Sequence, residues 1–197
     1  MSVIKKIQAR IKKIRQGKPF TTNLFLNLGS RAAIDKALSR LVKAKNIKRI
    51  TRGIFVQPLQ NRFVGEVMPD VSEVIEVMTR EQGEKIQIHG AEAARKFKLT
   101  TQMPILSVYY TSGSSRIIHI DKLNVKLIHT SNSKKLAHSG TNVGLALSAL
   151  WYFGKKQSNK TTIAKIRNNL SFQDFNTLCE AAKPEWMTKV IQDYCND

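Results

Sequence analysis

Nine candidate binding side chains between residues 30 and 52 carry hydroxyl, ammonium or guanidinium groups. They are Ser30, Arg31, Lys36, Ser39, Arg40, Lys43, Lys48, Arg49 and Arg52. A guanidinium group can hold a guanine edge through two hydrogen bonds, an ammonium group neutralises phosphate, and a hydroxyl bonds to bases or phosphates. This chemistry suits double-stranded DNA. We expect Arg31 and Arg40 at guanines and the cations of 48–52 at backbone phosphates or in the minor groove.

Hydrophobic periodicity predicts the helices that come before these groups. Apolar residues at helical spacing over 3–14 indicate an amphipathic helix with a basic second face. Gly17 and Pro19 end this helix. Either Thr21 or Thr22 can cap a short second helix.

The candidate DNA-binding residues themselves fall on a third helix and a hairpin. Ser30 can cap a helix from Arg31 to about Lys45, and two short strands, 47–50 and 54–56, flank a turn. Three helices followed by a hairpin is the order of a winged helix-turn-helix. In that fold the third helix enters the major groove.

The charge of the chain is concentrated in the same region. The 197 residues contain 33 Lys or Arg and 14 Asp or Glu, a net charge of +19. Residues 1–60 hold 15 of the cations and one acid, Asp35, whereas 61–197 hold 18 cations and 13 acids. A net charge of this size favours nucleic acid or an anionic membrane surface, and its uneven division favours duplex DNA. We place a domain boundary near residue 60.

The basic face also has an ordinary explanation, because lysine and arginine often only solvate a helix surface. Winged helices can serve as protein-interaction modules too. Asp35 is expected to pair with Arg31 or a nearby lysine rather than to contact cytosine. Lys155, Lys156, Lys160, Lys165 and Arg167 form a second basic cluster, for which a solvated face is the default and a contact with nucleic acid the alternative.

Residues 61–197 predict a mixed α/β domain, which makes the chain α+β overall. A helix is expected from about residue 70 to 82, a small sheet over about 86–129, and a helical bundle over about 142–195. Within the sheet, strands are expected at 86–88 and 105–110 and a hairpin at 117–128.

The sequence offers no catalytic constellation, so no enzyme activity, cofactor or metal is expected. It has no glycine-rich phosphate loop, no paired histidines on a helix and no nucleophile elbow. His89, His119, His129 and His138 lack metal-ligand spacing. Cys179 and Cys195 are expected to be buried thiols. No apolar run approaches the roughly 18 residues of a membrane span, and no export signal is evident, so the expected location is the cytoplasm.

Two segments resemble one known family. The segment FTTNLFLNLGSRAAIDKALSRLVKAKNIKRITRGIFVQP, Phe20–Pro58, resembles the winged helix of AbiEi-type antitoxins and related antitoxin-like regulators. Phe55 stands where relatives often have tyrosine in this motif. The segment IHGAEAARKFKLTTQMPILSVYYTSG, Ile88–Gly113, resembles the start of their second domain, and the similarity spans roughly residues 18–150.

The resemblance implies a type IV toxin–antitoxin or phage-defence setting. Family members repress their own promoter, at DNA repeats, through the winged helix. Their second domain counters a nucleotidyltransferase-like toxin without a stable complex, so direct contact with the toxin is not assumed. The alternative is a stand-alone winged-helix regulator or a protein-interaction module without a toxin. Whether the chain binds DNA as a homodimer is left open.

Overall fold

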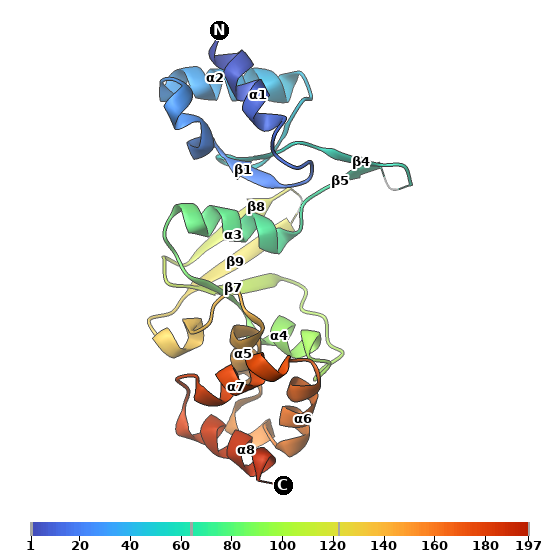
Figure 1. Cartoon of the computed structure of the whole chain (residues 1–197), viewed down its shortest axis with the longest axis vertical. Helices are drawn as coiled ribbons and strands as arrows, with labels where there is room; N and C mark the ends of the chain where they lie inside the picture. Colours follow the sequence, from blue (N-terminus) through green and yellow to red (C-terminus); the bar gives the residue numbers. More distant parts are fainter. Residues whose placement is uncertain (1, 64, 122, 197) are drawn as a thin grey trace. The chain divides into compact units, whose positions relative to one another are not determined.

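The computed structural model describes residues 2–63, 65–121 and 123–196, and its fold is mixed α+β (Figure 1). Contacts divide the chain into two compact units. The first comprises the residues up to Gly83 together with His119–Leu123, and the second comprises the remainder. The boundary expected near residue 60 falls inside the first unit. Among the described residues, no helix is both long and apolar enough to cross a membrane.

The first unit begins with helices and short strands and ends with a further helix. Its elements are α1 (Val3–Ile11), β1 (Pro19–Thr21), η1 (Thr22–Leu28), α2 (Arg31–Lys43), β2 (Lys48–Thr51), β3 (Ile54–Val56), β4 (Leu59–Asn61), β5 (Gly65–Val67) and α3 (Val71–Glu81).

Helix α2 forms as its sequence predicts. The Ser30 hydroxyl accepts a hydrogen bond from the Ala33 N–H at 3.4 Å, which satisfies one of the free donors of the first turn. The apolar stripe of α2 packs against α1 and η1. The core of this part of the unit consists of Ile7, Ile11, Phe20, Phe25, Ile34, Ala37, Leu38, Leu41, Ile47 and Phe55.

A three-stranded antiparallel sheet, in the order β1-β3-β2, completes this part of the unit. Strand β1 was not predicted; it pairs Phe20 with Phe55 of β3, and the two rings stack at 6.2 Å. The expected second helix is present as a 3₁₀ helix. Thr21 precedes it but makes no capping hydrogen bond with its side chain.

Helix α3 belongs with the first unit, although the sequence placed it in the second domain. The Asp70 carboxylate caps the helix, accepting from the Ser72 N–H at 2.7 Å. The Glu81 carboxylate, at the other end of α3, accepts hydrogen bonds from Thr21, at 2.9 Å, and from Asn23. These bonds join α3 to β1 and η1 across about 60 residues of sequence.

A two-stranded antiparallel hairpin, β4–β5, was also missed by the sequence analysis. It projects from the first unit, and Phe63 near its tip is 91% exposed (Figure 1). Its three-residue strands show no clear alternation of apolar and polar residues, because neither face is buried.

The second unit combines a small sheet with helices. Its elements are β6 (Ile86–Ile88), α4 (Gly90–Lys96), β7 (Ser107–Thr111), β8 (Arg116–Ile120), β9 (Leu123–His129), η2 (Ser133–Leu136), α5 (Asn142–Gln157), α6 (Lys160–Asn168), α7 (Phe172–Glu180) and α8 (Glu185–Cys195). The ends of β8 and β9 near their turn are grouped with the first unit.

The sheet has the order β6-β7-β9-β8. Strand β7 pairs antiparallel with β6 and parallel with β9. The predicted strand 105–110 begins later, at Ser107, and Ile105 is fully exposed before it. The apolar run of 105–110 therefore overstated the length of the strand.

The helices of the second unit begin at side-chain caps. Thr141, Asn159 and Ser171 accept hydrogen bonds from backbone N–H groups of α5, α6 and α7. Pro184 is the N-cap of α8. The helices enclose an apolar core of Ala93, Ala94, Phe97, Val143, Ala146, Leu147, Ala149, Leu150, Ile163, Ile166, Leu170, Phe175, Leu178, Ala181, Met187 and Ile191.

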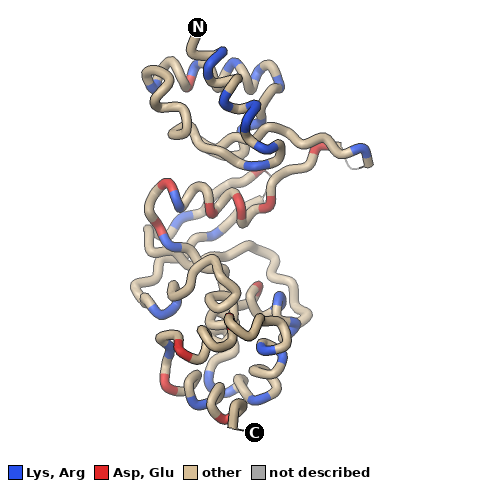
Figure 2. The backbone as a smooth tube through the Cα atoms, in the orientation of Figure 1, with Lys and Arg blue, Asp and Glu red and all other residues tan. Residues whose placement is uncertain are grey.

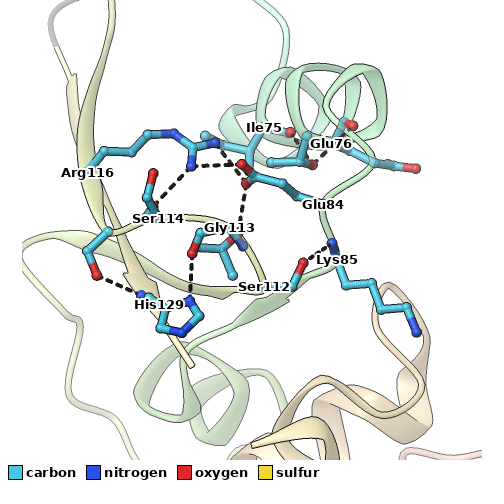
Figure 3. A network of polar contacts seen from close by, with 12 residues as sticks. Ile75, Glu76, Glu84, Lys85, Ser112, Gly113, Ser114, Arg116 and His129 are labelled. Carbon is cyan, nitrogen blue, oxygen red and sulfur yellow. Dashed lines mark hydrogen bonds and ion pairs between the residues drawn. The ribbon is translucent and has the colours of Figure 1, made fainter. Parts of the chain in front are cut away.

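One polar network ties the first residue of the second unit to β8 (Figure 3). Arg116 donates to both carboxylate oxygens of Glu84, at 3.0 and 2.8 Å, and Thr111 Oγ1 donates to the same group at 2.8 Å. Burial alone would raise the pKa of Glu84, but the hydrogen bonds from Arg116 and Thr111 and the charge of Arg116 lower it below its ordinary value. A side chain at Gly113 would overlap the Glu84 carboxylate.

Candidate nucleic-acid interface

The exposed face of α2 carries all the candidate residues predicted for it. Ser30, Arg31, Lys36, Ser39, Arg40 and Lys43 are exposed to solvent, while Ile34, Ala37, Leu38 and Leu41 are buried on the other side. The cap bond uses one lone pair of the Ser30 hydroxyl, whose proton remains available for an external acceptor.

The two arginines of α2 lie on opposite edges of this face. Nine residues separate Arg31 from Arg40, and at 3.6 residues per turn they stand about 180° apart around the helix axis. A helix that entered the major groove face-on would present its middle to base edges and its two edges to the flanking backbones. The middle is formed by Ala32, Lys36, Ser39 and Lys43. The helix geometry therefore does not support the expectation that Arg31 and Arg40 both contact guanines.

Arg31 is paired with an acid, as the sequence predicted. Its Nε lies 3.2 Å from Asp35 Oδ2, one helical turn away, and the two side chains are 57% and 55% exposed. A solvent-exposed ion pair of this kind forms and breaks readily, so Arg31 can leave Asp35 and bind a phosphate instead.

Arg31 and Arg52 also line one hollow of about 330 Å³ together with Glu81. Glu81 comes from α3, a helix that the sequence places in the second domain, and hydrogen bonds from Thr21 and Asn23 hold its carboxylate there. An acid beside two candidate DNA-binding arginines reduces the local positive charge. This part of the first unit is therefore less favourable to DNA than the middle of α2.

The other candidate cations of the β2–β3 hairpin are partly engaged within the first unit. Lys48 Nζ lies 3.3 Å from Glu66 Oε1 of β5, and Arg49 Nε donates to the Thr51 carbonyl at 3.4 Å. Neither Glu66 nor Glu81 could be identified from the sequence as a partner, because both contacts join distant segments of the chain.

Most cations and most acids of the helices in the first unit lie on different helices (Figure 2). Helices α1 and α2 and the segment that follows α1 carry most of its lysines and arginines, whereas α3 carries Glu73, Glu76 and Glu81. One basic side chain of α1, Arg10, donates to Asn27 at 2.7 Å. Most of the other basic side chains of α1 and of the segment that follows it are exposed, including Lys5, Lys6, Lys12 and Lys13.

The histidines are spread over the fold. His129 Nδ1 lies 2.8 Å from the Gly113 carbonyl, and the backbone N–H of His129 donates to the Ser115 hydroxyl; Gly113 and Ser115 both lie just before β8. His119 lies near the other end of β8, so the two histidines do not face each other across the hairpin. Among the described residues, no three His, Cys, Asp or Glu side chains come together as metal ligands would.

The expectation of two buried thiols is wrong for Cys195, which is exposed, whereas Cys179 is partly buried. Burial raises the pKa of Cys179, and the neighbouring Cys195 raises it further, so the Cys179 thiol stays protonated at neutral pH.

Comparison with known proteins places the chain in a family. Residues 6–178 match the family of unknown function DUF6088, and the chain belongs to that family. No curated protein matches the chain.

Proposed function

We propose that the chain is a winged helix-turn-helix protein that represses its own promoter by binding DNA repeats there. We propose further that its second unit counters a nucleotidyltransferase-like toxin, as in AbiEi-type antitoxins. The DNA-binding half rests on the first unit, and the antitoxin half rests on the resemblance of the two sequence segments.

One observation carries the DNA-binding proposal. The exposed face of α2 presents Lys36, Ser39, Arg40 and Lys43, and its single acid, Asp35, is already paired with Arg31. The order of elements supports the proposal, since α1, η1 and α2 are followed by the β2–β3 hairpin, as in a winged helix-turn-helix.

A mobility-shift titration with the DNA upstream of the gene tests this proposal. We expect binding that prefers the upstream sequence over unrelated DNA and weakens steeply as salt increases. Absence of a shift, or equal binding to every sequence, would refute the repressor function. A partner protein that bound independently of salt, without any DNA shift, would support the protein-interaction alternative instead.

A double substitution of Lys36 and Lys43 to alanine locates the interface. If both ammonium groups contact phosphates, the slope of log K against log salt should become shallower by about 1.8. The matched control replaces Lys155 and Lys156, two exposed lysines near the end of α5, and should leave the slope unchanged. A smaller slope in the control alone would place the DNA contacts on the second unit and contradict the assignment to α2.

The antitoxin half needs its own experiment. The reading frame next to the gene is expressed with and without this chain, and growth is followed. We expect a nucleotidyltransferase-like product that arrests growth and is countered by this chain. No such neighbour, or no rescue, would leave a stand-alone regulator, which is the alternative function.

A further inference from the structure

A small cavity in the second unit is not used by the proposed DNA-binding function. Its volume is about 190 Å³, and it lies between β7, η2 and α5, beside the start of α4. The side chains that matter to its chemistry are His89, Tyr110, Lys135, Trp151 and Tyr152. All of them belong to the second unit.

Trp151, which lines this cavity, carries an unsatisfied donor. Its indole Nε1–H is buried, and within the described part of the chain it has no hydrogen-bond partner. Indole can only donate, so this group requires an acceptor. Native proteins rarely leave a buried donor unpaired, and a ligand oxygen would satisfy it.

Lys135 places a positive charge among aromatic rings of the same cavity. Its Nζ lies 4.9 Å from the ring centre of Tyr110 and 5.4 Å from that of Trp151. No carboxylate of the described residues lies within ion-pair distance of it. The ammonium group therefore keeps its three donors for an external acceptor.

His89 adds a further donor because of its place in front of α4. Its Nδ1 accepts from the Ala91 N–H at 3.4 Å, so the ring proton of the neutral form is on Nε2. Burial lowers the pKa of His89, and the charge of Lys135 lowers it further, so the ring is neutral at pH 7. The ring lies 5.1 Å from Tyr110 and 6.1 Å from Tyr152, centre to centre.

We propose that this cavity binds an oxyanion group, a carboxylate or a phosphate, of a small ligand. Four of the polar groups that line it are able to donate: the Lys135 ammonium, the indole N–H of Trp151, the imidazole N–H of His89 and the hydroxyl of Tyr110. They present one positive charge and no negative one. The cavity is smaller than the roughly 300 Å³ at which sites for drug-sized ligands begin, so the ligand is compact. The rings of Tyr110 and Tyr152 would contact its body.

The two tryptophans of the chain allow a direct test by NMR. Full-length protein labelled with ¹⁵N-tryptophan gives two indole signals, and the Trp151→Phe variant assigns them. The protein is titrated separately with inorganic phosphate, acetate and benzoate at constant ionic strength. We expect at least one of these to shift the Trp151 signal saturably and to leave the Trp186 signal in place. The three anions distinguish a phosphate from a carboxylate ligand and an aliphatic from an aromatic body.

A pair of adjacent lysines provides the matched control. Lys135→Ala should weaken anion binding about tenfold or more, because it removes a charge-assisted contact. Lys134→Ala removes the same charge from an exposed neighbour outside the cavity and should bind as the parent does. Lys135→Met, which keeps the length of the side chain, separates loss of charge from loss of packing. A Trp151 signal that none of the anions shifts, or equal affinity in the Lys135 variants and the parent, would overturn the proposal.

Discussion

Replacing Asp35 with asparagine is expected to strengthen DNA binding. Asp35 is the one acid among the first 60 residues, and it lies on the exposed face of α2, one turn from Arg31. The substitution removes a charge that repels phosphates and leaves the Arg31 guanidinium without its partner. Because both side chains are more than half exposed, the pair contributes only about 0–1 kcal/mol to folding.

The size of the gain follows from counterion release. Each phosphate contact adds about 0.9 to the steepness of log K against log salt. One released guanidinium at a phosphate therefore steepens the slope by about 0.9. If the variant and the parent bind DNA equally at 1 M salt, this difference in slope makes the variant bind about eightfold more tightly near 0.1 M salt. The expected cost in stability is too small to unfold the protein.

Fluorescence anisotropy with labelled upstream DNA, repeated at several salt concentrations, measures both quantities. Asp193→Asn makes the same change of charge at an exposed position on α8 and serves as control. An unchanged slope for Asp35→Asn would refute the reasoning, and so would an equal gain in the control. Weaker binding would show that Asp35 itself contacts the DNA, as a cytosine-reading carboxylate would.

Three further predictions concern the second unit. Glu84→Gln should lower the free energy of unfolding by about 2 kcal/mol in urea, because Arg116 loses a charged partner whose side chain is only 15% exposed. The pKa of Glu84 is lowered in the folded state, so its contribution is present above the unfolded value near 4.5 and is lost as pH falls through the folded value. Gly90→Ala should destabilise the protein by about 1–3 kcal/mol, because the added carbon would overlap Tyr152 and the backbone of α5. Exposed Cys195 should react with a thiol reagent before Cys179 does.

Each of these predictions can fail on its own. A Glu84→Gln variant whose acid unfolding matches that of the parent would contradict the lowered pKa. Alanine at position 90 with unchanged stability would mean that α4 and α5 separate at no cost. Equal reaction rates of the two thiols in native protein would contradict the burial of Cys179.

Local patterns determined most of the secondary structure. The stripe of Ile34, Ala37, Leu38 and Leu41 and the cap at Ser30 specify α2, because helix periodicity and capping act within a few residues. The same holds for the predicted strand 86–88. Strand β1 was missed, because three residues carry no period and their extended form depends on pairing with β3.

The candidate DNA-binding surface was determined only in part by the sequence. Residue types and helix period were enough to put Lys36, Ser39 and Lys43 on one exposed face. They could not show that Glu66 pairs with Lys48 or that Glu81 shares a hollow with Arg31 and Arg52. These contacts depend on how α3 and the β4–β5 hairpin pack, and no local rule encodes packing between distant segments.

The sequence by itself determined where the charge is, which helix is amphipathic and which residues cap it. Only the tertiary structure decided which charges have partners in distant segments and which donors meet in one cavity. His89, Tyr110, Lys135 and Trp151 are spread over about 60 residues of sequence without a shared motif. They come together because β7 pairs with β6 and because α5 packs on α4 at Gly90, a position that has no room for a side chain.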